Sequence, residues 1–141
     1  MLANKGSDLW TTFPGATVFD AIEQMAQRNV GALPVMEGAK LVGIVSERDY
    51  TRKVILQGKS SKDTEVHTIM TRSPVTIAGS ESVARSLQVM SEQRVRHLPV
   101  VDDEGKVVGM VTIGDLVKWV ISAQGAIISQ LEGYIQGSYP G

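Results

Sequence analysis

The sequence predicts an α/β fold of the α+β kind, built from two β-α-β-β-α repeats and a C-terminal helix extension. The first observation is a motif that occurs twice, as GIVSERD at 43–49 and as GMVTIGD at 109–115. The second is that helix-like and strand-like segments precede both motifs in the same order. Because each repeat is too small to bury its apolar face well alone, we expect the two repeats to share one core.

The first repeat is expected to contain a helix, two strands and a second helix. Within 17–30, apolar residues recur at helical spacing: Val18, Ile22, Met25 and Val30. The segments 32–36 and 41–45 read as strands on either side of a polar turn. A second helix is expected to follow Ser46 and to end near residue 56, and 59–65 form a polar loop or linker.

The second repeat follows the same order. Four of its residues match the first repeat at an offset of 65 positions: Val83, Met90, Val95 and Pro99. One residue is inserted in the turn at 102–105, after which Asp115 matches Asp49 at an offset of 66. Turns tolerate such insertions, so the register of the two repeats is continuous.

The helix after Asp115 is expected to run further than its counterpart in the first repeat. Its apolar side steps by three and four residues: Val117, Val120 or Ile121, Gln124, Ile128, Leu131 and Ile135. This stripe is too long for one repeat to cover, so we expect it to pack on a partner chain. The expected units are a first repeat at 8–62, a second repeat at 63–122 and a C-terminal extension and tail at 123–141.

Composition excludes several classes of protein. Hydrophobic residues make up 43% of the 141-residue chain and charged residues 21%, which is typical of globular proteins. The net charge of -1 is dispersed, so nucleic-acid binding is not expected. There are no cysteines, and no run of ~18 apolar residues or secretory signal occurs, so we expect no disulfide, no membrane span and a cytoplasmic location.

The repeated motif suits a phosphorylated, ribose-bearing ligand. Ser46 and Thr112 are placed at expected helix starts, where free N–H groups and the helix dipole favour an anion. Asp49 and Asp115 are acceptors one turn into these helices, and the vicinal hydroxyls of a ribose are donors. The alternative is that Ser-x-x-Asp is a variant of the capping box, with no ligand involved.

Basic residues near the motifs differ between the repeats. Arg96 and His97 precede the strand of the second repeat, where the first repeat has Gly31 and Ala32, and Arg48 lies inside the first motif. Three further basic side chains are expected to be solvated: Arg52, Lys53 and His67. No nucleophile–base set, metal-ligand cluster or phosphate-binding glycine loop is visible, so we do not expect an enzyme.

The two-copy pattern resembles a tandem pair of cystathionine β-synthase (CBS) domains, or Bateman module, as found in small stand-alone proteins. The resemblance rests on NVGALPV at 29–35 before the first motif and RVRHLPV at 94–100 before the second, and it extends from about Trp10 to Trp119. It implies repeats related by a pseudo-twofold axis. Clefts between them would accept adenosyl compounds: AMP, ADP, ATP, NAD or S-adenosylmethionine.

The resemblance also implies which residues form each cleft. The site at the second motif is expected to comprise Thr112, Gly114, Asp115, Arg96, His97, Leu98, Thr12, Ala16 and Ala21. The site at the first motif is expected to comprise Ser46, Arg48, Asp49, Ala32, Leu33, Thr76 and Ser86. Because Arg96 and His97 belong to the second repeat, we expect the Asp115 site to bind the more phosphorylated or the tighter ligand.

The implied function is a non-catalytic regulatory module that signals energy or redox state to an unidentified partner protein. The bound ligand would be AMP, ADP, ATP or NAD. A homodimer is expected through the helices next to the motifs and the C-terminal helix. The alternative is an interaction or dimerisation scaffold without physiological nucleotide binding.

Overall fold

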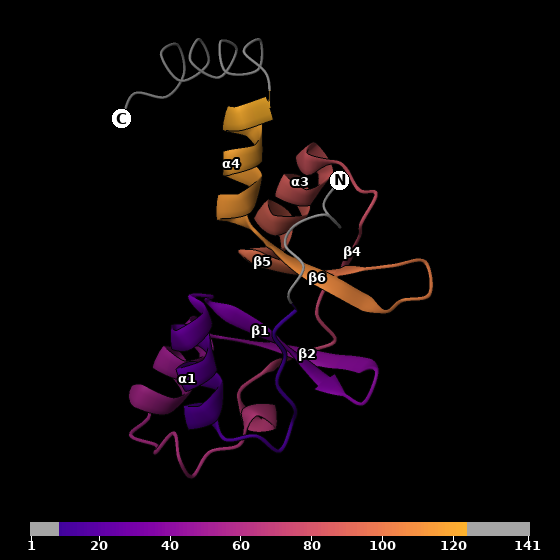
Figure 1. Cartoon of the computed structure of the whole chain (residues 1–141). Helices are drawn as coiled ribbons and strands as arrows, with labels where there is room; N and C mark the ends of the chain where they lie inside the picture. The colour runs from indigo at the N-terminus through magenta and orange to yellow at the C-terminus, as the bar shows by residue number, and fades with distance from the viewer. Residues whose placement is uncertain (1–8, 124–141) are drawn as a thin grey trace, which may run out of the picture.

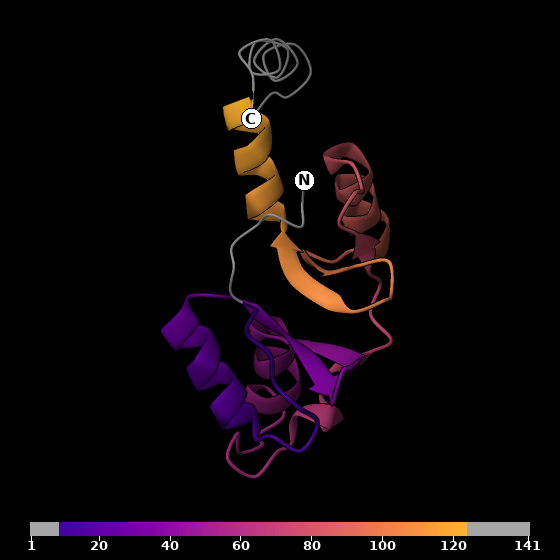
Figure 2. The same ribbon diagram turned by 45° about the vertical axis from the view of Figure 1, so that its right-hand side comes forward.

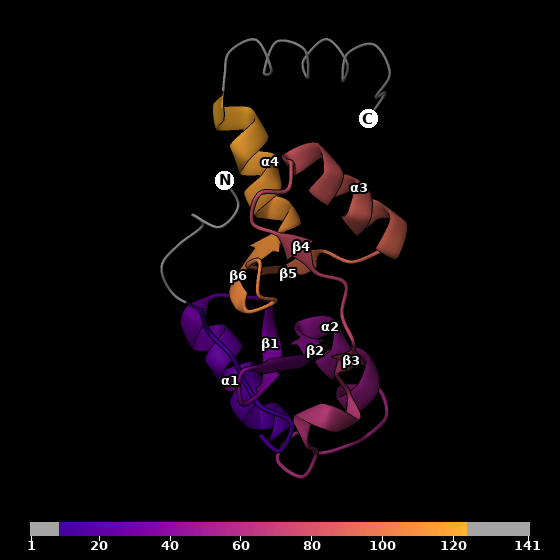
Figure 3. The same ribbon diagram turned by 90° about the vertical axis from the view of Figure 1, so that its right-hand side faces the viewer.

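The computed structural model describes residues 9–123 and shows two α/β repeats stacked on each other (Figure 1). The small sheets of the repeats lie toward the middle of the molecule. Helices α3 and α4 lie on the outer side of the second sheet, as the turned views also show (Figures 2 and 3). The expected mixed α/β fold class is confirmed. The expected helical stripe beyond residue 123 lies outside the described residues.

The order of elements agrees with the expected repeat. The first repeat contains α1 (Val18–Arg28), β1 (Ala32–Glu37), β2 (Lys40–Ser46), α2 (Glu47–Tyr50) and the π-helical turn η2 (Thr51–Ile55), and the segment after it contains the 3-10 turn η3 (Val66–Thr68) and β3 (Thr71–Arg72). The second contains β4 (Ile77–Ala78), α3 (Val83–Gln93), β5 (His97–Val101), β6 (Val107–Thr112) and α4 (Ile113–Ala123). Within residues 9–123, no helix combines the length and apolar character needed to cross a bilayer.

Equivalent caps begin and end the first helix of each repeat. The side chain of Thr17 accepts a hydrogen bond from the backbone N–H of Asp20 at 3.1 Å before α1. Ser82 accepts from Arg85 N–H at 3.0 Å before α3. Both helices have 11 residues and end at a left-handed residue, Asn29 with φ 57° and Arg94 with φ 56°. Asparagine adopts this conformation readily, whereas arginine does so at a cost.

The sheets repeat the same pairing. β1 pairs with β2 and β5 with β6, in each case antiparallel and with a register shift near the end of the first strand, at Val35/Met36 and at Val100/Val101. β4 pairs parallel with β5 through Ile77 and Val100. An isolated parallel bridge joins Thr12 to Val35 at the equivalent place. This bridge supplies the short first strand that the β-α-β-β-α order requires.

Two hydrophobic clusters, one in each repeat, replace the single shared core that we expected from the sequence. In the first, Leu33 and Val45 of the sheet pack with Met25 of α1. The segment after the first repeat completes this cluster with buried side chains: Val66, Ile69 and Met70. Each repeat therefore buries its own apolar face, because residues outside the helices and long strands cover what the helices leave open.

The glycine of the first motif is required by a close approach of two strands. Gly43 pairs with Arg72 of β3, and a Cβ atom added to Gly43 would lie 2.6 Å from Met70 Sδ and 2.9 Å from the main-chain oxygen of Thr71. The equivalent Gly109 has no such neighbour, since an added Cβ would meet no described heavy atom within 4 Å. The shared glycine is therefore a packing requirement in the first repeat only.

Candidate functional site

The first motif forms a complete capping box at the start of α2. The Ser46 N–H donates to Asp49 Oδ2 at 2.9 Å, and the Ser46 hydroxyl donates to the same oxygen at 3.0 Å. In return, the Asp49 N–H donates to Ser46 Oγ at 3.2 Å. The capping alternative is thus realised, and it holds the Asp49 carboxylate in one orientation. Its side chain is 15% exposed and lies beside solvent-accessible space.

The second motif has the same local geometry. Thr112 N–H donates to Asp115 Oδ2 at 2.9 Å, and Asp115 N–H donates to Thr112 Oγ1 at 3.0 Å. In each repeat, a backbone hydrogen bond links the motif to the residue that precedes the first long strand. Glu47 N–H donates to the carbonyl of Gly31 before β1, and Ile113 N–H donates to that of Arg96 before β5, both at 3.0 Å. The geometry around each aspartate is thus set by residues on two segments.

A cavity of about 480 Å³ joins the first motif to the second repeat. Its volume falls in the range of about 300–1,000 Å³ that is usual for small-molecule sites. The lining residues of the first repeat and of the following strand are Gly31, Ile44, Ser46, Glu47, Arg48, Asp49 and Thr71. Those of the second repeat are Arg94, Val95, Arg96 and His97.

The cavity groups the predicted residues differently from the sequence-based assignment. Arg96 and His97, which we assigned to the Asp115 site, line the same cavity as Asp49 and Arg48. His97 is also the strand partner of Thr112, so it stands between the two motifs. The first motif thus faces the loop that precedes the first long strand of the second repeat, and sequence spacing within one repeat does not show this relation.

Positive charge is concentrated in this cavity. Arg48, Arg94 and Arg96 are all exposed to solvent there, against the carboxylates of Glu47 and Asp49. Two of the three arginines come from the second repeat. An anion in the cavity would therefore contact cations from both repeats, and exposed guanidinium groups are well suited to phosphate oxygens.

Gly31 allows the two repeats to approach each other at the cavity. A Cβ atom added to Gly31 would lie 3.2 Å from Glu47 Oε1 and 3.4 Å from His97 Nε2. The Glu47 carboxylate and the His97 ring therefore both lie close to Gly31. A side chain at this position would push against one of them, so glycine keeps this end of the cavity open.

Lys53 is not the solvated side chain that we expected. Its Nζ lies 3.2 Å from Asp49 Oδ1 and donates to the main-chain oxygen of Ile69 at 2.9 Å. The pair is spaced by four residues on one helix, which is the separation that brings side chains together. Arg52 is exposed as expected, and His67 lies 2.8 Å from Glu65 Oε1 in a largely exposed pair.

Other predicted site residues lie away from this cavity. Leu33 and Leu98 are 0% exposed and belong to the two hydrophobic clusters, and Ala32 is 4% exposed. Four more of the predicted residues are buried in the fold. Ala16 and Ala21 belong to the first cluster, Thr12 pairs with Val35, and the Ser86 hydroxyl donates to the Ser82 carbonyl. Thr76 is exposed at the surface. An adenine slot built from Leu33 or Leu98 is therefore not open in this structure.

Several cavity residues were not predicted from the sequence: Gly31, Ile44, Glu47, Thr71, Arg94 and Val95. Arg94 carried the clearest available signal, because it stands two residues before Arg96 and matches Asn29 of the first repeat. Thr71 carried none, since it reaches the cavity through the pairing of β3 with β2.

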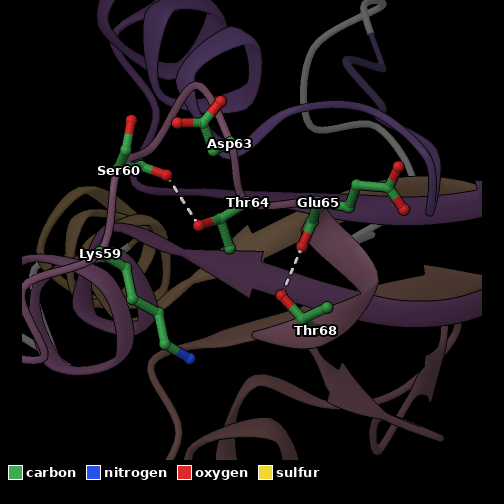
Figure 4. Close-up of a pocket in the computed structure, with 6 residues that line it drawn as sticks. All are labelled: Lys59, Ser60, Asp63, Thr64, Glu65 and Thr68. Atoms are coloured by element: carbon green, nitrogen blue, oxygen red, sulfur yellow. Dashed lines mark hydrogen bonds between the residues drawn. The ribbon is translucent and has the colours of Figure 1, made fainter.

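A second hollow of about 580 Å³ lies in the segment between the repeats (Figure 4). Its two threonine hydroxyls are engaged with the backbone: Thr64 Oγ1 donates to the Ser60 carbonyl at 2.7 Å, and Thr68 Oγ1 donates to that of Glu65 at 2.7 Å. The Lys59 and Asp63 side chains point in different directions (Figure 4). No group of three or more metal-ligating side chains occurs in residues 9–123. This hollow therefore offers no converging set of ligand groups.

The two repeats are those of a known family. The family model described as the CBS domain matches the chain twice, at residues 6–55 and 66–122. The chain therefore belongs to the CBS-domain family and carries two copies of the domain, as its motifs indicate.

Relatives agree with this membership. The chain is 46% identical over 139 residues to the CBS domain-containing protein CBSX3, mitochondrial, of Arabidopsis thaliana, which covers 95% of this chain and 66% of that protein. The structure of the present chain superposes with a TM-score of 0.80 on a putative signal-transduction protein with CBS domains from Burkholderia ambifaria. The two are 47% identical, and the match covers 84% of this chain and 87% of the other. The chain spans between 36% and 66% of the length of the first curated relatives that it matches.

Two structural relatives hold adenosine-containing ligands. CBSX2 was solved in complex with AMP and superposes with a TM-score of 0.67 at 31% identity, over 82% of this chain and 90% of the other. The CBS domain pair of MJ0100 was solved with 5-methylthioadenosine and S-adenosyl-L-methionine. It superposes with a TM-score of 0.73 at 30% identity, over 80% of this chain and 92% of the other.

Proposed function

We propose that this protein is a non-catalytic regulatory module that binds adenine nucleotides between its two CBS repeats. The observation that supports this most is the cavity that brings Asp49 of the first repeat together with Arg94 and Arg96 of the second. The ligand class is proposed by analogy with the relatives that hold AMP and adenosyl compounds. We keep AMP, ADP, ATP and NAD as candidates.

The arrangement of charges suggests how a nucleotide would lie. The Asp49 carboxylate would accept hydrogen bonds from the ribose hydroxyls, and the arginines would bind the phosphates. Because Arg96 and His97 line the cavity of the first motif, we propose this cavity for the more phosphorylated ligand, in place of the Asp115 site expected from the sequence. A nucleotide bound in this way would contact both repeats and favour one arrangement of them.

Thermal unfolding with adenosine, AMP, ADP, ATP, NAD and S-adenosylmethionine tests the proposal. A ligand at a hundredfold excess over its dissociation constant stabilises the folded chain by ~2.7 kcal/mol, which raises the melting temperature by about 5–10 °C. Arg96→Gln is expected to reduce the shift with nucleotides. Arg85→Gln, which removes the same charge from exposed α3, is the control and is expected to leave the shift unchanged. The absence of a shift with every compound would contradict the proposal.

The alternative is a protein-interaction or dimerisation scaffold, and the complete capping boxes favour it. Ser46 and Asp49 satisfy each other without a ligand, so the motif has a structural use of its own. A scaffold would unfold at the same temperature with and without every adenine compound. It would keep its partner in pull-down experiments that lack nucleotide.

We also propose a homodimer that uses α4. Ile113, Val117 and Ile121 are spaced by four residues along this helix and are 41%, 46% and 54% exposed. An apolar row of this kind on one helix face is typical of a surface that is covered by another chain. The output of the module would then pass to an unidentified regulated protein.

The cytoplasmic location stays a prediction. The Arabidopsis relative is named as mitochondrial, and cell fractionation decides between the two locations.

A further inference from the structure

Lys53 is held in a fixed place next to the cavity. Its Nζ contacts Asp49 Oδ1 at 3.2 Å and the main-chain oxygen of Ile69 at 2.9 Å. Ile69 is 1% exposed and belongs to the first hydrophobic cluster, so its carbonyl is a rigid partner. The contrast is Arg85 and Glu92 on α3, whose side chains are 50% and 56% exposed and 3.8 Å apart. Lys53 thus has two partners on two segments, which localises its charge.

The Lys53 contact uses an oxygen that a ribose would need. A carboxylate offers about four acceptor positions. The Ser46 N–H and hydroxyl occupy two of them on Asp49 Oδ2, and the Lys53 ammonium forms an ion pair with Oδ1 at 3.2 Å. The two hydroxyl donors of a ribose would need acceptor positions on Oδ1. Contact between both hydroxyls and Asp49 would therefore compete with the Lys53 ion pair.

Lys53 also changes the electrostatic potential of the cavity. Asp49 is one of two carboxylates there, and its negative charge would repel a phosphate group. With the Lys53 ammonium 3.2 Å away, this charge is largely compensated. A phosphate that enters the cavity is attracted by the arginines. Of the two carboxylates that line the cavity, Glu47 is the one that is not paired with Lys53.

We propose that Lys53 is a specificity-determining residue that makes the Asp49 cavity favour phosphorylated over neutral adenosine compounds. It weakens the contact to the ribose, which all these compounds share, and strengthens the attraction for phosphate, which only the nucleotides carry. The proposal rests on the proposed nucleotide-binding function. The matching position of the second repeat is Trp119, so this selection belongs to the first motif alone.

Calorimetry with adenosine and AMP tests this inference, because the two compounds differ only in a phosphate group. The background is the full chain with Asp115→Asn, which weakens the second motif and keeps an acceptor for its cap. Lys53→Met in this background is expected to lower the ratio of AMP affinity to adenosine affinity about fivefold, the upper range for an ion pair that is partly exposed. Lys53→Arg keeps the charge, and Lys106→Met removes a lysine from an exposed turn; both are expected to keep the ratio within about twofold.

The outcomes separate the two proposals. A ratio that is the same in Lys53→Met as in the background would overturn the role of Lys53 and leave nucleotide binding intact. Equal weakening of both compounds would show that Lys53 only braces the helix against Ile69, and it would also overturn the role. If neither compound bound to the unmodified chain, the Lys53 proposal would fail, and the nucleotide-binding proposal would fail as well if ADP, ATP and NAD did not bind either. Lys53→Gln replaces Lys53→Met if the latter does not fold.

Discussion

Arg94 occupies a position where the fold and the cavity have opposite requirements. It ends α3 in the left-handed conformation with φ 56°, and it also lines the cavity with an exposed guanidinium group. A side chain other than glycine or asparagine costs about 1 kcal/mol in this conformation. The equivalent residue, Asn29, adopts φ 57° at the end of α1. A strained residue beside a cavity supports a functional role for its side chain.

We therefore expect Arg94→Asn to stabilise the free protein and to weaken nucleotide binding. The relief of backbone strain is worth about 1 kcal/mol, or a rise in melting temperature of about 3 °C for a chain of this size. Loss of one exposed cation from the cavity is expected to weaken AMP binding about fivefold, with adenosine affected less. Thermal unfolding without ligand measures the first effect, and calorimetry with AMP and adenosine measures the second.

Matched variants separate strain from charge. Asn29→Arg places arginine at the equivalent helix end and is expected to lower the melting temperature by about 3 °C, the reverse of the effect of Arg94→Asn. Arg85→Gln removes a cation from the exposed face of α3 and is expected to leave AMP affinity unchanged. A melting temperature of Arg94→Asn equal to or below that of the unmodified chain would refute the strain argument. Unchanged AMP affinity would refute the role of Arg94 in the cavity.

Two further predictions concern packing and assembly. Gly43→Ala is expected to lower the free energy of unfolding by about 1–3 kcal/mol, because the new methyl group would lie 2.6 Å from Met70 Sδ. Gly109→Ala is expected to leave the free energy of unfolding unchanged. Chemical denaturation compares the two variants, and equal midpoints would contradict the close approach at Gly43. Val117→Glu is expected to convert a dimer to a monomer in analytical ultracentrifugation by placing a charge in the exposed apolar row of α4. An unchanged sedimentation coefficient, or a monomeric unmodified chain, would exclude α4 as a dimer interface.

The sequence predicted the helices and long strands well because periodicity and turn residues determine them locally. The segments expected at 17–30, 32–36 and 41–45 correspond to α1, β1 and β2. The core was harder to predict, because Val66 and Met70 lie in a connecting segment without helical or strand periodicity and yet complete the first cluster. Local patterns do not show which connecting residues turn inward.

The site was predicted in its parts and not in their combination. Ser46 and Asp49 were recognisable from their spacing, and Arg96 and His97 from their charge. Their meeting in one cavity depends on how the repeats stack, and no spacing within a repeat encodes that contact. The pairing of Lys53 with Asp49 was available in principle, since an acid and a base four residues apart on a helix lie side by side.

The asymmetry between the repeats has a physical meaning if the two repeats are related by the pseudo-twofold axis that the family resemblance implies. Residues 94–97 of the second repeat carry two arginines and a histidine, and they meet the motif of the first repeat, which contains Arg48. The symmetry-related combination would be 29–32 with 112–115, in which Asp115 is the only charged residue. The two repeats supply similar frameworks, and the arginines of both repeats belong to the first combination. We therefore expect a ligand rich in phosphate to prefer the first combination, and a neutral or cationic adenosine compound to prefer the second.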